Sequence, residues 1–330
     1  MAEGTCVTAS AGPSPQGMGS GRTTIDGGSG AFGANAATRA VAQRRARIAV
    51  YVFVGIGAGL GWAWLAAMVA SMLSGADMSA LGPGMGIFNR LNGFASLPPE
   101  VRAGLAALCA PITTTWSLAD WATVAAMWVA MVAAMMLPSA LPVFLAYGDL
   151  GAERAARGER VVPSVVLGLG YLAVWLAFAV VATAVQGGLT QARVMTPAGV
   201  PATMILAATT LIAAGIYQFT PLKAGCLARC RAPLPFFLER WTDRVAGVFG
   251  QGVRQGIDCL GCCWALMGVM FAVGVMNVVW IALLGALAVV EKVTTSDVVS
   301  RVIGVVLIAW GVGLLAASPV GGMIWMRFFG

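Results

Sequence analysis

Six stretches of this chain are long and apolar enough to cross a lipid bilayer, and this constrains its fold more than any other feature. About 20 helical residues cross a hydrocarbon core of about 30 Å. The six stretches cover residues 48–72, 120–147, 163–186, 201–220, 259–290 and 299–317. Their uninterrupted apolar runs exclude an outer-membrane β-barrel, whose strands alternate apolar and polar residues. The sequence predicts an all-α fold, a polytopic transmembrane helical bundle of about six spans.

The composition supports this fold class. Hydrophobic residues make up 59% of the 330 residues and charged residues only 10%, whereas soluble domains carry about 25% charged residues. A soluble enzyme with a water-facing surface is therefore excluded. Residues 1–43 are rich in Gly, Ala and Ser and are expected to form a disordered N-terminal arm. Residues 44–330 are expected to form an integral membrane helical domain.

The distribution of positive charge predicts the orientation. With the N-terminus inside, the inner segments carry 15 Lys and Arg residues and the outer segments carry 5. Because positively charged segments resist translocation, both termini are expected in the cytoplasm of a multi-pass inner-membrane protein. The net charge of +7 suits contact with anionic lipid headgroups. The lipid bilayer is therefore the expected partner, and no nucleic acid is expected.

Five of the seven cysteines fall into two short clusters. Cys226 and Cys230 form the first, and Cys259, Cys262 and Cys263 form the second. Spacings of three and four residues put cysteines on one face of a helix. The predicted orientation places both clusters on the cytoplasmic side, where thiols stay reduced and closely spaced thiols typically bind metal or perform redox chemistry. Thiolates select Cu(I), zinc or an iron–sulfur cluster over hard cations.

Methionines within the spans are further candidate ligands. Met135 ends a series spaced by four residues, and Met267 and Met270 follow the second cysteine cluster. Their thioether sulfurs are soft ligands suited to Cu(I). The alternative is that these methionines fill irregular gaps between helices.

Several strings around the cysteines resemble a known family. Residues 215–223, 226–233 and 259–267 are similar to a bacterial family of uncharacterised predicted metal-binding integral membrane proteins, and the resemblance extends over about 115–317. It implies a helical inner-membrane protein that binds metal through its cysteines. Family members often carry histidines near both cysteine pairs, where this chain has Arg229 and Gln255. With no histidine in the chain, thiolate and thioether ligands favour Cu(I) over zinc or an iron–sulfur cluster.

Three functions remain open at this point. The first is a metal-handling membrane protein that binds Cu(I) and exchanges it with a donor or acceptor protein, in metal transfer or homeostasis. The second is a membrane thiol–disulfide protein or electron carrier. The third is an assembly subunit with a structural metal site. The absence of histidine excludes Ser-His-Asp and Cys-His catalysis, so an enzyme is not favoured. A shared metal site requires the two cysteine clusters to meet in space.

Overall fold

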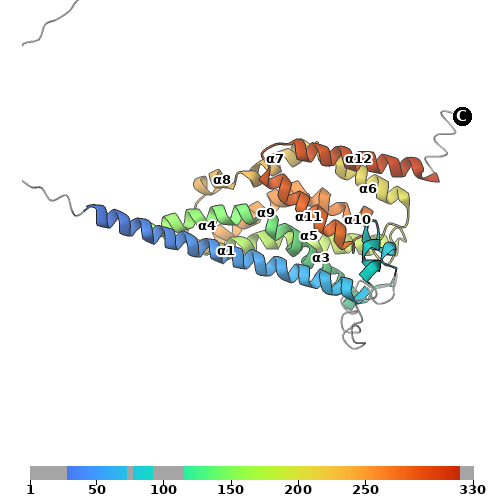
Figure 1. Ribbon diagram of the computed structural model, residues 1–330, viewed down its shortest axis with the longest axis horizontal. Coiled ribbons are helices and arrows are strands. Elements are labelled where there is room, and N and C mark those ends of the chain that lie inside the picture. Colours follow the sequence, from blue (N-terminus) through green and yellow to red (C-terminus); the bar gives the residue numbers. More distant parts are fainter. Residues whose placement is uncertain (1–27, 73–76, 92–114, 320–330) are drawn as a thin grey trace, which may run out of the picture.

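The computed structural model describes residues 28–72, 77–91 and 115–319. These residues form helices without a strand, apart from an isolated bridge between Met195 and Pro201. The helices are α1 (Gly28–Met72), η1 (Met78–Leu81), η2 (Met85–Leu91), α3 (Leu118–Ser139), α4 (Leu141–Ala156), α5 (Ser164–Gln191), α6 (Met204–Tyr217), α7 (Pro221–Arg231), α8 (Pro233–Glu239), α9 (Val245–Gly268), α10 (Met270–Val273), α11 (Val278–Val293) and α12 (Val298–Ala317). The long helices run along one common direction (Figure 1), which confirms the all-α bundle.

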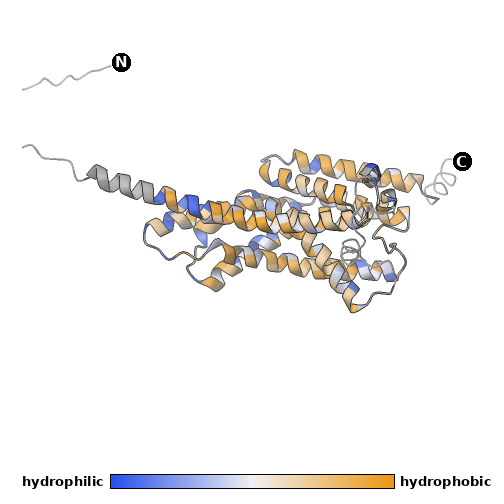
Figure 2. Cartoon of the chain, turned by 60° about the horizontal axis from the view of Figure 1, so that its bottom comes forward, coloured by the Kyte–Doolittle hydropathy of each residue, from blue (hydrophilic) through white to orange (hydrophobic). Residues whose placement is uncertain are grey.

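Five helical segments are long and apolar enough to cross a membrane. They are Arg39–Met72, Leu118–Ser139, Ser164–Gln191, Val245–Val273 and Val298–Ala317. The pair α6 and α7, bent by 63°, counts as a sixth span if its two helices are taken together. Hydrophobic residues dominate the middle of the bundle, and hydrophilic residues gather toward its ends (Figure 2). Five to six candidate spans fit the predicted multi-pass bundle of about six spans.

The predicted single span over 259–290 is wrong. The chain leaves α9, passes through α10 and turns at Gly274, whose φ of 103° is easily reached only without a side chain. Asn277 then caps α11 by accepting a hydrogen bond from the Trp280 amide. A continuous helix would separate Cys259 from Lys292, 33 residues later, by about 50 Å. Instead, Lys292 Nζ lies 2.9 Å from Cys259 Sγ, so α9 and α11 form a helical hairpin.

This hairpin changes the relation between the chain ends. α1 enters the bundle at the end where it packs on α4, whereas α12 ends at the opposite end of the bundle (Figure 1). The sequence predicts both termini on one side, whereas the first and last described helices begin and end at opposite ends of the bundle. The difference arises because the hairpin adds a reversal of direction. Lys292 is one of the five basic residues that the sequence assigns to the outer segments, but it lies at the same level as Cys259.

The N-terminal arm also differs from its expectation in part. α1 begins at Gly28, so residues 28–43, expected to be disordered, are helical. Alanine is frequent in this part of the sequence and has the highest intrinsic helix propensity. Residues 1–27 lie outside the described residues.

Two local features bring α7 and α5 against the middle of α9. Pro221 occupies the first turn of α7, and Thr220 accepts a hydrogen bond from the Lys223 amide, so a new helix starts directly after α6. The resulting bend lays α7 on α9. On the other side, a Cβ at Gly252 would collide with the carbonyl oxygen of Leu167, so α5 packs closely on α9 only because this position is glycine.

Candidate metal centre

Three thiols converge on one side of α9. The Sγ atoms of Cys259, Cys262 and Cys263 all lie within 4.8 Å of one another, and those of Cys262 and Cys263 are 3.2 Å apart. Each residue is at most 2% exposed. Sulfurs about 2.3 Å from a shared ion lie up to about 4.6 Å apart. The three thiols therefore have the spacing needed to hold one soft ion after small side-chain adjustments.

The first cysteine cluster meets the second. Cys230 Sγ on α7 lies 3.9 Å from Cys262 Sγ on α9. Cys226 Sγ packs on Gly261, where a Cβ would lie only 2.5 Å from that sulfur. All five cysteines are free thiols and buried. The contact between α7 and α9 thus brings together two sequence segments that are about 30 residues apart.

A buried lysine lies beside the thiols. Lys292 Nζ on α11 donates to Cys259 Sγ at 2.9 Å and to Ser139 Oγ at the end of α3 at 2.8 Å. Lys292 is only 6% exposed. A buried charge requires a partner, and hydrogen bonds to ionised groups are the strongest in proteins. An ammonium group in this position stabilises negative charge on the thiol cluster.

Tyr171 completes the surroundings of Cys259. Its hydroxyl lies 3.0 Å from Cys259 Sγ and donates to the carbonyl oxygen of Met136 at 3.0 Å. Met136 Sδ in turn lies 3.9 Å from Ser139 Oγ. Cys259 therefore has polar neighbours from α5 and α11, and each of these is in turn hydrogen-bonded to the end of α3.

A buried ion pair next to the thiol cluster links α7 to α11. Lys223 Nζ contacts the two carboxylate oxygens of Glu291 at 2.7 and 2.9 Å and also donates to Gln218 Oε1. Both charged side chains are 1% exposed. Arg231 Nε donates to the carbonyl oxygen of Glu291 at 3.0 Å. These contacts hold the α7 cysteines at a fixed position relative to Lys292.

A polar cavity lies beside the cysteine clusters. Arg229 Nε donates to Asp258 Oδ1 at 2.7 Å, and Arg229 Nη2 lies 3.4 Å from Cys226 Sγ. The Arg229 side chain is about half exposed, whereas that of Asp258 is buried. Both residues and Gln255 line a cavity of about 270 Å³. The buried cysteines do not line this cavity, but Arg229 contacts Cys226 and Asp258 immediately precedes Cys259, so its polar lining adjoins both clusters.

The three candidate methionines lie in the buried core. Met135 packs against Gly285 of α11. Met267 follows Cys263 by four residues, which is about 6 Å along the helix axis, and Met270 begins α10. Each is at most 1% exposed. This burial suits packing as well as ligation, so their role as ligands stays a prediction.

Comparison with protein-family models gives a match to PpoB2, described as a copper chaperone, over residues 125–314. The matched segment is more than half of the 330-residue chain and contains all five clustered cysteines. The chain belongs to the PpoB2 copper chaperone family. No curated protein and no solved structure matches it. The PpoB2 match and the thiol cluster together support copper-related metal binding. They agree with the metal-binding character of the family that the sequence resembles, and the specific family named there stays a prediction.

Three residues at the centre of this PpoB2 family member are not among the site residues predicted from the sequence: Lys292, Glu291 and Tyr171. The predicted span over 259–290 places Glu291 and Lys292 at its outer end. A signal was present for the first two, because ionisable residues next to a long apolar run commonly mark functional sites in membrane proteins. Tyr171 carries no such signal, since tyrosine is common in membrane helices.

Proposed function

We propose that this protein binds Cu(I) through Cys259, Cys262 and Cys263 and passes the ion to or from a partner protein at a membrane. The observation that carries this proposal is the group of three buried thiols within 4.8 Å of one another, in a chain of a copper chaperone family. Thiolates bind soft ions such as Cu(I) in preference to hard cations.

The charge balance around the thiols favours Cu(I). With two of the three cysteines bound as thiolates and the third kept as a neutral thiol, the thiolates and one Cu(I) carry a net charge of −1, which the ammonium of Lys292 neutralises. Structural zinc takes four ligands, and a fourth thiolate from Cys230 would leave the site with a net charge of −1 even beside Lys292. Buried groups without net charge are the least unfavourable in an apolar interior. Cu(I) with a low coordination number therefore fits this cluster better than zinc.

Cys230 and Cys226 provide a route for transfer. Cys230 Sγ is 3.9 Å from Cys262 Sγ, so a bound ion could exchange a ligand in the cluster for Cys230 without a large movement. Cys226 lies one turn earlier on the same helix and contacts Arg229, which lines the polar cavity. We infer that copper enters or leaves through this cavity and over the α7 thiols.

The inner membrane is the proposed location, with the cavity facing the cytoplasm. Basic residues gather on the segments at the end of the bundle formed by α4, α8 and the start of α9. They are Arg154, Arg157, Arg160, Arg240, Arg244 and Arg254. Positively charged segments remain on the cytoplasmic side.

Copper content tests the proposal directly. Protein purified without oxygen is loaded with Cu(I), desalted and analysed for copper per chain. The double variant Cys259→Ser/Cys262→Ser should lose the bound copper, because two of the three thiols are removed. Cys109→Ser, which changes a cysteine outside both clusters, serves as the matched control. Equal copper content in the wild type and the double variant would contradict the proposal.

A further inference from the structure

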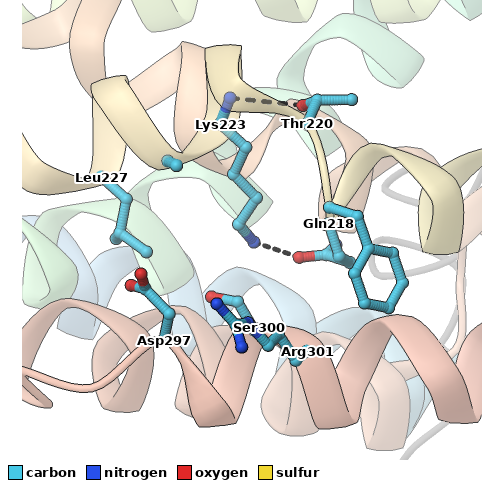
Figure 3. Close-up of a pocket in the computed structure, with 9 residues that line it drawn as sticks. Gln218, Thr220, Lys223, Leu227, Asp297, Ser300 and Arg301 are labelled. Atoms are coloured by element: carbon cyan, nitrogen blue, oxygen red, sulfur yellow. Dashed lines mark hydrogen bonds between the residues drawn. The ribbon is translucent and has the colours of Figure 1, made fainter.

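A second polar cavity lies between the α6–α7 bend and the start of α12. Its volume is about 440 Å³, and its lining contains Gln218, Lys223, Asp297, Ser300 and Arg301. Figure 3 shows Gln218 and Lys223 pointing toward one another from the α6–α7 side, with Ser300 and Arg301 on the α12 side. None of the copper ligands proposed above lines this cavity.

Two buried groups in this cavity lack hydrogen-bond partners. Gln218 Oε1 accepts from Lys223 Nζ, but Gln218 Nε2 has no partner among the described residues. Ser300 Oγ is likewise unpartnered within the described part of the chain. Both residues are only 5% exposed. Because an unsatisfied buried donor is unfavourable, these groups indicate that the cavity accommodates a ligand with acceptor oxygens.

The charges around the cavity leave one cation without a counter-ion. Lys223 is neutralised by Glu291, and Asp297 by Arg231 at 2.7 Å. Arg301 makes no ion pair with another described residue. The cavity therefore combines a guanidinium group, an amide donor and a hydroxyl donor. It also lies at the first turn of the 20-residue helix α12, where the helix dipole favours negative charge.

We propose that this cavity binds a phosphate group. Arg301 would provide charge-assisted hydrogen bonds, and Gln218 Nε2 and Ser300 Oγ would donate to the remaining oxygens. An apolar side chain forms one border of the site: Phe219 lines the cavity and is 50% exposed. This border lets the headgroup of an anionic phospholipid reach the cavity from the bilayer, while soluble phosphate offers the same chemistry from the water.

The test measures binding to the full chain purified in a neutral detergent. Calorimetric titration uses two probes, inorganic phosphate at constant ionic strength and dihexanoyl phosphatidylglycerol. Arg301→Gln should weaken binding at least about tenfold, because hydrogen bonds to charged groups are the strongest. Ser300→Ala should weaken it by a smaller factor. Arg160→Gln, which removes an exposed arginine outside the cavity, is the matched control and should bind like the wild type.

The outcomes separate the two sources of phosphate. Binding of phosphatidylglycerol alone, weakened by both cavity variants, identifies a lipid headgroup site. Binding of both probes, weakened in the same order, identifies a site for soluble phosphate as well. No binding of either probe, or equal binding by wild type, Arg301→Gln and Ser300→Ala, would overturn the proposal. Thermal unfolding without ligand verifies that each variant is folded, and copper content should be unchanged.

Discussion

Replacing Lys292 with leucine tests the electrostatic part of the copper site. Leucine stays apolar at this buried position, offers no ligand atom to copper, and removes the ammonium group that donates to Cys259 Sγ at 2.9 Å. Without this charge, two thiolates and Cu(I) would leave a net negative charge in the protein interior. We expect Lys292→Leu to weaken Cu(I) binding while the protein remains folded.

The size of the effect follows from the geometry. Unit charges 2.9 Å apart attract by about 6 kcal/mol at an effective dielectric constant of about 20. Desolvation of the buried ammonium offsets part of this attraction. The net contribution of a hydrogen bond to a charged group is about 1.5–3 kcal/mol. Since about 1.4 kcal/mol corresponds to a tenfold change in affinity, Cu(I) binding should weaken at least about tenfold.

Competition with a Cu(I) chelator such as bathocuproine disulfonate, without oxygen, measures the affinity. Ser139→Ala is the matched control, because it removes the other partner of Lys292 Nζ but keeps the charge. We expect this control to change the affinity much less than Lys292→Leu. Folded Lys292→Leu protein with the wild-type affinity for Cu(I) would refute the role of Lys292 in charge compensation.

Two further substitutions test the packing that holds the site together. Gly261→Ala should destabilise the protein by about 1–3 kcal/mol and lower its copper content, because the new Cβ would lie 2.5 Å from Cys226 Sγ. Gly268→Ala, on the same helix with nothing within 4 Å of its Cβ, should be neutral or slightly stabilising; equal thermal unfolding of the two variants would show that the α7–α9 contact is looser than described. Glu291→Gln leaves Lys223 buried without a counter-charge and should lower stability by about 3–5 kcal/mol. The apolar double variant Lys223→Met/Glu291→Leu should recover much of that loss, and a double variant as unstable as Glu291→Gln would contradict the ion-pair explanation.

The helical fold and the meeting of the cysteines could be anticipated from the sequence. Long apolar runs leave a chain few alternatives to a membrane helix, and the spacing of Cys226 and Cys230 places both thiols on one face of a helix. Such local patterns survive folding because they depend on neighbouring residues alone. The prediction that the two cysteine clusters meet rests on the chemistry of thiols, because nothing in either segment specifies the packing of α7 on α9. The contact between Cys230 and Cys262 confirms that they meet.

The helical hairpin and the position of Lys292 could not be anticipated in the same way. Hydropathy does not distinguish a single long span over 259–290 from two apolar arms joined by a turn. Gly274 and Asn277 mark that turn, but both residues also occur inside membrane helices. Without the turn, Glu291 and Lys292 would end a span on the far side of the membrane. The ion pair with Lys223 and the contact with Cys259 follow only from the return of α11.

X-ray absorption at the copper edge tests the proposed site most directly. Protein loaded with Cu(I) without oxygen should show copper bound only by two or three sulfur atoms, and Cys259→Ser/Cys262→Ser should lose this spectrum. Copper bound by nitrogen or oxygen atoms, or an unchanged sulfur shell in the double variant, would contradict a copper site built on the α9 thiols.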